Sequence, residues 1–125
     1  NDNKLVKKGS YSYDKKKLLK LINMQGFSNI LKIHDIDIIK NLENFLKKNP
    51  HLRFKLVFLD IGINSVLDIA IPLIWKRLVK GGILIFDQYN HELAPGETLA
   101  IEKHLKGKKI RTIKNSWMPN AYIIK

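Results

Sequence analysis

The sequence contains no cysteine among its 125 residues. This absence excludes a disulfide framework and any cysteine-ligated zinc or iron–sulfur site. Long apolar runs are also missing, because no stretch approaches the ~20 apolar residues of a membrane-spanning helix, and no segment resembles a signal peptide. We therefore expect a cytoplasmic protein without a membrane partner.

Acidic residues are scarce relative to basic ones. The chain has 23 Lys and Arg against 11 Asp and Glu, which gives a formal charge of +12. Such an excess can serve a nucleic-acid surface. The excess is almost entirely lysine, however, scattered in short groups without a recognisable nucleic-acid-binding module. We do not expect a nucleic-acid partner.

The length of 125 residues suits one domain with a single core. The first residue is Asn1 rather than Met, so we expect that an N-terminal part of a longer protein precedes it. We interpret residues 1–125 as a single α/β domain that forms the C-terminal portion of a longer fold.

The first third of the chain predicts a helix and a strand. Apolar residues at helical spacing predict a helix over Lys15–Met24, which Gly26 ends. A strand is expected over Asn29–Ile33, and His34 and Asp35 follow it.

The middle of the chain predicts a helix over Asp37–Lys48 and a strand over Phe54–Ile61. The near-continuous apolar run of this strand is typical of a strand that is covered on both faces. Ser65 and Asp68 can form a capping box at the start of the next helix. That helix is expected to reach Val79, where two glycines end it.

Pro72 lies within this predicted helix. Proline removes a backbone donor, so we expect either a kink at Pro72 or a helix that starts near Ile71.

The last third predicts a second doubly covered strand over Ile83–Phe86 and a polar loop over Gln88–Gly96. A helix over Glu97–Leu105 follows. Strands over Lys109–Lys114 and Ala121–Ile124 are expected to form an antiparallel hairpin.

The predicted elements alternate between helices and strands and end on two strands. This order specifies an α/β fold with a Rossmann-like, mostly parallel sheet and helices on both faces. We expect a C-terminal antiparallel β-hairpin and a fold that is incomplete at the N-terminus.

Three consecutive predicted strands each end in an acid, namely Asp35, Asp60 and Asp87. Ligands in such sheets lie beyond the carboxyl ends of the strands. We therefore expect the three carboxylates along one rim, where they can bind a cofactor's hydroxyl or amino groups, a divalent cation or a substrate proton. The alternative for each acid by itself is that it only terminates its strand and caps the loop or helix that follows.

Several stretches resemble a known family. NPHLRFKLVFLDIG, LIWKRLVKGGILIFDQYNHELAPGETLAIEKHL and the terminal AYIIK are similar to the second half of class I S-adenosylmethionine-dependent methyltransferases. The similarity is greatest to the macrocin O-methyltransferase type, which methylates sugar hydroxyls, and covers roughly residues 9–125. The resemblance implies S-adenosylmethionine as cofactor and a sugar or nucleotide-sugar as small-molecule substrate.

The same resemblance implies roles for individual residues. Asp35, next to His34, matches the carboxylate that contacts the cofactor's adenine. Asp60 matches the first acid of an Asp-x-Asp motif and is expected in metal binding and catalysis. Gly62 stands where the second acid of that motif would be.

The later strand completes the implied metal site. Asp87 matches one acid of a pair, and Gln88 replaces its neighbour, so a Mg²⁺ site would consist of Asp60, Asp87 and the Gln88 amide and would be weakened. His91 can act as the catalytic base, although a solvated loop histidine is the alternative. Glu97 is equally a first-turn helix acid or a ligand.

A glycine-rich turn is the most conspicuous part of the family pattern that is missing. Class I methyltransferases bind the methionine end of the cofactor on such a turn after the first strand, and this sequence has no G-x-G. We expect the turn upstream of Asn1. Removal of the first strands would expose the edge of a central strand, so we expect either a longer polypeptide that covers this edge or a homo-oligomer that pairs along it.

Three functions follow from the sequence, in order of preference. The first is an S-adenosylmethionine-dependent O-methyltransferase, present here as a fragment. The second is a non-catalytic methyltransferase-like domain that has a decayed metal site and serves in binding or assembly. The third is a basic nucleic-acid-binding domain.

Overall fold

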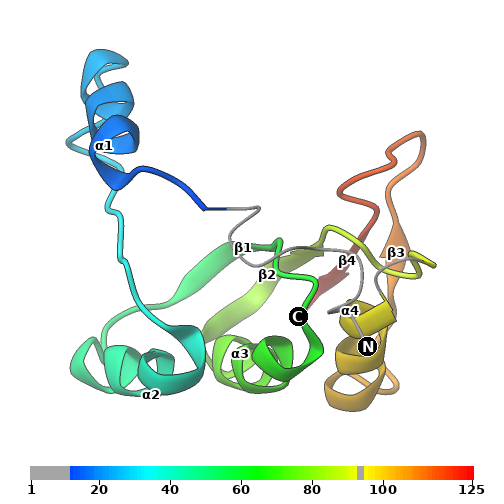
Figure 1. The fold of residues 1–125 in the computed structure, drawn as a ribbon. Coiled ribbons are helices and arrows are strands. Elements are labelled where there is room, and N and C mark those ends of the chain that lie inside the picture. The colour runs from blue at the N-terminus through cyan, green and yellow to red at the C-terminus, as the bar shows by residue number, and fades with distance from the viewer. Residues whose placement is uncertain (1–11, 93–94) are drawn as a thin grey trace. The chain divides into compact units, whose positions relative to one another are not determined.

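The computed structural model describes residues 12–92 and 95–125 of the chain (Figure 1). The chain divides into two compact units, of which the first ends at Ile36 and the second begins at Asp37. The interpretation of residues 1–125 as a single domain remains a prediction.

The first unit contains the helix α1 over Lys15–Met24, with the bounds that the sequence predicted. Asp14 caps its N-terminus, because its carboxylate accepts hydrogen bonds from the backbone N–H groups of Lys16 and Lys17 at 2.9 and 3.3 Å. Gly26 follows the helix with a φ of 74°, a conformation that glycine adopts at little cost.

The strand predicted over Asn29–Ile33 is wrong. Residues 28–30 form a turn and residues 31–37 are irregular. The side chains of Ile30 and Leu31 are exposed. A strand needs a neighbour that satisfies its backbone hydrogen-bonding groups, and no described strand pairs with this segment. Its apolar residues alone therefore do not make it a strand.

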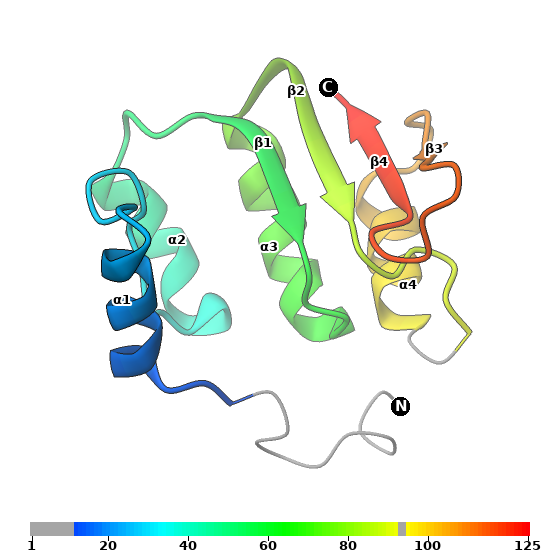
Figure 2. The same cartoon turned by 90° about the horizontal axis from the view of Figure 1, so that it is seen from above.

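The second unit contains a four-stranded sheet in the order β1-β2-β4-β3. Its strands are β1 over Phe54–Leu59, β2 over Leu78–Phe86, β3 over Arg111–Thr112 and β4 over Ala121–Ile124. β1 and β2 are parallel, whereas β4 runs antiparallel to both β2 and β3 (Figure 2). The predicted α/β class and its closing antiparallel hairpin are confirmed, and the described sheet is mixed.

The helices of the second unit are α2 over Ile38–Lys48, α3 over Asn64–Arg77 and α4 over Pro95–His104. They lie together on one side of the sheet (Figure 1). Pro72 lies inside α3, so the alternative start near Ile71 is wrong. No helix within residues 12–92 and 95–125 is long and apolar enough to cross a membrane.

The core of the second unit lies between the sheet and these helices. It is built from alternate residues of the strands and from the inner faces of α3 and α4. Its buried members are Leu59, Leu67, Ile71, Leu78, Leu84, Phe86, Ala100, Ile101, Leu105, Ala121 and Ile123.

β2 begins at Leu78, before the two glycines that were expected to end the preceding helix. Gly81 has a φ of 73°, and a Cβ on Gly82 would lie 2.9 Å from the carbonyl oxygen of Val79. The pairing of β1 with β2 shifts register at this point. The two glycines therefore form an irregularity within the strand, where the backbone approaches itself too closely for a side chain.

The predicted capping box at the start of α3 is wrong. The N-cap is Ile63, which makes no side-chain hydrogen bond. Asp68 instead accepts a hydrogen bond from the Lys103 ammonium at 2.8 Å, and its other oxygen lies 2.8 Å from the His104 ring. These two contacts lower the pKa of Asp68 and connect α3 to α4.

β1 was predicted to be covered on both faces, and this is wrong for the described unit. Leu56 is 58% exposed and Phe58 is 48% exposed, on the face of the sheet opposite to α2, α3 and α4. β1 is also an edge strand of the described sheet. One face of β1 and its free edge are therefore open.

Candidate functional site

Asp60 and Asp87 lie next to each other at the carboxyl ends of the two parallel strands. The residues that precede them, Leu59 and Phe86, are partners in the β1-β2 pairing. The backbone N–H of Asp87 donates to the carbonyl of Leu59 at 3.2 Å. Asp60 is exposed and Asp87 is buried. Two of the three acids expected on one rim thus share one edge.

A third carboxylate of this edge belongs to Glu97, in the first turn of α4. Its side chain is fully buried. Oε1 accepts a hydrogen bond from the backbone N–H of Gln88 at 2.7 Å, whereas Oε2 has no hydrogen-bond partner within the described residues. We call Asp60, Asp87 and Glu97 the acidic edge.

Two members of the acidic edge, Asp87 and Glu97, hold protons more tightly than isolated carboxylates would. Burial, together with the negative charges of Asp87 and Asp60, raises the pKa of Glu97 to about 7, although the hydrogen bond from Gln88 opposes this change. Burial and the nearby Asp60 also raise the pKa of Asp87. Glu97 can therefore hold a proton near neutral pH.

Gly62 and Gln88, the two departures from the family pattern, are neighbours in space. Gly62 has a φ of 67°, and a Cβ built on it would lie 2.9 Å from Oε1 of Gln88. The Gln88 amide therefore occupies the volume that a side chain at position 62 would enter. A substitution at one of these positions affects the other.

The predicted Mg²⁺ site finds no support in the described residues. They contain no group of three or more His, Cys, Asp or Glu side chains arranged to hold a metal ion. Mg²⁺ requires near-octahedral oxygen ligands at short distances. Asp60 and Asp87, together with the Gln88 amide, do not fit that requirement by themselves.

Asp35 and His34 belong to the first unit. Both are exposed and follow an irregular segment, and Lys15 forms an ion pair with Asp35 at 3.4 Å. The expectation that a parallel strand delivers Asp35 to the same rim as Asp60 is wrong, because that strand is absent. The role of His34 and Asp35 in cofactor binding remains a prediction.

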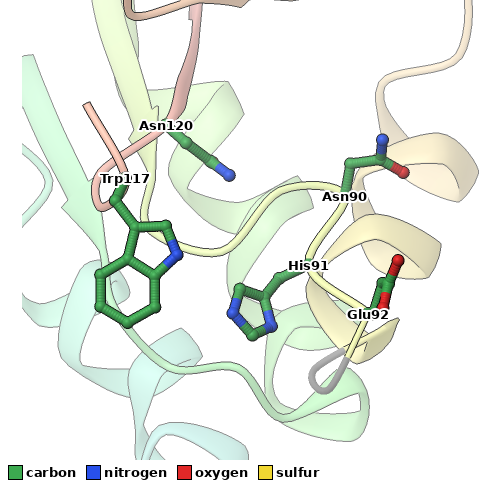
Figure 3. Close-up of a pocket in the computed structure, with 5 residues that line it drawn as sticks. All are labelled: Asn90, His91, Glu92, Trp117 and Asn120. Carbon is green, nitrogen blue, oxygen red and sulfur yellow. The ribbon is translucent and has the colours of Figure 1, made fainter. Parts of the chain in front are cut away.

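A pocket of about 400 Å³ lies at the loop that follows β2 (Figure 3). Its lining comes from the loop after β2 and from the loop between β3 and β4. We call this cavity the hairpin pocket. It is lined by Asn90, His91, Glu92, Trp117 and Asn120. The rings of His91 and Trp117 are 6.2 Å apart and tilted by 51°. His91, the predicted base, is half-buried and contributes to this pocket.

Hydrogen bonds hold both walls of the hairpin pocket. The Asn120 amide accepts from the backbone N–H of Tyr89 at 2.9 Å and donates to the Tyr89 carbonyl at 2.6 Å. The backbone N–H of Asn120 donates to Phe86 at 3.2 Å. On the other wall, the backbone N–H of Asn90 donates to the Thr98 hydroxyl at 2.7 Å. The pocket wall that carries Asn120 is therefore fixed to Phe86, at the carboxyl end of β2, and to Tyr89.

Sequence reasoning missed Trp117 and Asn120 and left Glu97 undecided. The burial of Glu97 had a signal, because Ala100 and Ile101 follow it at helical spacings of three and four and form part of the core. Trp117 also had a signal, since a large aromatic residue stands within the segment Asn115–Asn120, which was predicted as a turn. Nothing in the sequence indicated that Asn120 would bind the backbone of Tyr89.

Comparisons with known proteins give matches in structure alone. Neither a scan of protein-family models nor a search of curated proteins finds a match. The fold is similar to two solved structures of CalS11, one described as an apo TDP-rhamnose 3′-O-methyltransferase of calicheamicin biosynthesis and the other as a calicheamicin methyltransferase.

Both CalS11 structures match with a TM-score of 0.71 and 22% identity over 87% of this chain. The match covers 49% of one CalS11 chain and 44% of the other, so this chain spans about half the length of its structural neighbours. The similarity shows that the chain has the fold of these methyltransferases over most of its length.

Proposed function

We propose that this chain is part of an S-adenosylmethionine-dependent O-methyltransferase that acts on a hydroxyl of a sugar or nucleotide-sugar. The observation that carries the proposal is the similarity in fold to CalS11, with a TM-score of 0.71 over 87% of the chain. The location of the acidic edge supports it, because ligands of α/β sheets bind beyond the carboxyl ends of the strands.

The donor set of the acidic edge suits the cofactor. S-adenosylmethionine carries a sulfonium and an amino group, and the carboxylates of Asp60 and Asp87 attract these positive charges. When bound, it supplies an electrophilic methyl group. Asp35, together with His34, is proposed to contact the adenine. The glycine-rich turn of related enzymes has no counterpart in this sequence.

The chain's own residues would prepare the acceptor. His91 is proposed as the general base that takes the proton of the sugar hydroxyl, since a neutral imidazole can accept a proton near pH 7. Asp60, exposed at the end of β1, is proposed to accept a hydrogen bond from the same hydroxyl and orient it. Correct placement of the oxygen would contribute much of the rate.

Titration calorimetry with S-adenosylhomocysteine tests the proposal in the full-length protein, followed by a methyl-transfer assay with nucleotide-sugars. We expect saturable binding and transfer. His91→Ala should lower kcat by roughly 10²- to 10⁴-fold while S-adenosylhomocysteine binding is unchanged. Absence of heat at saturating concentrations would contradict the proposal.

A non-catalytic methyltransferase-like domain is the second candidate. The backbone at Gly62 favours it, because its φ of 67° disfavours any side chain there and a Cβ would lie 2.9 Å from Oε1 of Gln88. Gly62→Asp and Gln88→Asp must be introduced together, since either change alone leaves a clash or a gap. A gain in Mg²⁺ affinity in this double variant supports the enzyme, whereas no gain supports the non-catalytic domain.

Self-association along β1 is proposed for the same chain. β1 is an edge strand, and its exposed Leu56 and Phe58 add an apolar surface to that open edge. Light scattering should give a mass above that of a monomer, and replacing both residues by lysine should shift it to the monomer. A monomeric wild-type mass at the highest concentration tested would refute this proposal.

A further inference from the structure

The two tryptophans of the chain have very different surroundings. Trp75 is partly buried, and the ammonium groups of Lys125 and Lys108 lie 5.4 and 5.9 Å from its ring centroid. Trp117 is 77% exposed, and its indole borders the hairpin pocket beside His91 (Figure 3). A large aromatic surface that faces water in a pocket is a feature of ligand-binding sites.

The hydrogen bonds that fix the walls of the hairpin pocket do not involve the side chains of Asn90, Glu92 and Trp117. The Asn120 amide is engaged with both backbone groups of Tyr89. Asn90 is held through its backbone N–H, in a left-handed conformation with a φ of 58°. The two loops that carry the pocket residues are thus fixed by these hydrogen bonds, which reduces the entropy cost of binding.

The charge of the hairpin pocket indicates which part of a nucleotide-sugar can bind there. Among residues 12–92 and 95–125, its lining contains the Glu92 carboxylate and no lysine or arginine, although the chain has 23 of these basic residues. A diphosphate would be repelled by this carboxylate and would find no cation to bind. Neutral hydroxyl groups can donate hydrogen bonds to the Glu92 carboxylate, and they can both donate to and accept from the Asn90 amide.

We propose that the hairpin pocket is the subsite for the sugar ring of the acceptor, with Trp117 as the platform on which the apolar face of a hexose stacks. Glu92 and Asn90 would bind hydroxyl groups at the ring's edge, and Asn120 positions the platform. This assignment rests on the proposed function, and it places a bound hydroxyl beside His91.

The test uses the indole N–H signals of the 125-residue chain, which contains only Trp75 and Trp117. Trp117→Phe assigns the two signals. Titration with methyl α-rhamnopyranoside and methyl α-glucopyranoside should shift the Trp117 signal saturably and leave the Trp75 signal in place. Equal shifts of both signals, or no shift with either glycoside, would overturn the assignment.

Variants measure how much the platform contributes. By saturation-transfer measurement on the glycoside, Trp117→Ala should weaken binding roughly tenfold and Trp117→Phe roughly threefold. Tyr13→Ala removes another exposed aromatic residue outside the pocket and should leave binding unchanged. An unchanged Trp75 signal shows that each variant is folded. Binding by Trp117→Ala equal to that of the wild type would refute the platform.

A parallel titration with TDP identifies the part of the ligand that is recognised. A shift of Trp117 with TDP but not with the glycosides would overturn the proposal in favour of nucleobase stacking. Glycoside binding without S-adenosylhomocysteine binding would leave the sugar subsite standing and refute the proposed function. Methyl transfer by Trp117→Ala with an unchanged KM would support the proposed function and refute the sugar subsite.

Discussion

The two faces of the sheet in the second unit are built from the same strands and similar residues, yet they have different environments. On the face toward α2, α3 and α4, Phe86 is fully buried. On the opposite face, Phe58 is 48% exposed. Ile123 and Ile124 repeat this contrast at adjacent positions of β4, since the first is buried and the second exposed.

Apolar residues of similar type therefore contribute differently to the stability of this fold. A buried side chain stabilises the fold through the surface that it removes from water and through close packing, and an exposed one contributes little of either. The open face of this sheet therefore carries apolar surface whose stabilising contribution is not realised within the described unit.

The largest expected effect compares the two phenylalanines. Phe86→Ala should lower the free energy of unfolding by about 3–5 kcal/mol, because it leaves a cavity in the core. In the monomer, Phe58→Ala should cost less than about 1 kcal/mol. Urea denaturation of both variants measures the difference. Equal losses would show that the open face is covered in solution.

An intermediate effect concerns the acid buried on the covered side. The folded state raises the pKa of Glu97 from 4.5 to about 7, so it keeps a proton that the unfolded chain loses between these values. The contribution of Glu97 to stability therefore declines as pH rises through this window and is lowest above it. Between about pH 5 and about pH 8, the wild type should lose roughly 1–3 kcal/mol more than Glu97→Gln.

Glu102→Gln is the matched control for this measurement, because Glu102 belongs to the same helix as Glu97 but is exposed. Its stability should differ from that of the wild type by less than about 0.5 kcal/mol at either pH. A Glu97→Gln variant with the same dependence on pH as the wild type would show that Glu97 is ionised and solvated in the folded protein.

The smallest expected effect compares adjacent isoleucines of β4. Ile123→Val removes one buried methylene and should cost about 0.5–1.5 kcal/mol. Ile124→Val should be close to neutral, because that side chain is exposed. Urea denaturation of the pair at one pH is sufficient. A larger loss of stability in Ile124→Val than in Ile123→Val would show that Ile124, and not Ile123, lies on the covered face of β4.

Much of the fold could be predicted from periodicity and turn residues. The bounds of α1 and β4 were predicted as observed, and α2 differs only by its capping residue. The start of β2 was missed because a glycine pair after a helix usually ends it, whereas here the pair lies inside a strand. The strand predicted over Asn29–Ile33 was wrong because strand formation depends on a partner, which local sequence does not specify.

The candidate site was predictable in part. The positions of Asp60 and Asp87 followed from the order of strands, since parallel neighbours place their carboxyl ends together. The proximity of Gly62 to Gln88, and of Trp117 to His91, could not be predicted, because each pair joins loops that are far apart in the sequence.

The sequence by itself determined the alternation of helices and strands, the absence of cysteine chemistry and the acids that follow β1 and β2, because these depend on local pattern and composition. Only the tertiary structure decided that Glu97 is buried beside Asp87, that one sheet face is open and that Trp117 faces His91. The physical reason is that burial and proximity depend on packing between distant segments, which no local pattern encodes.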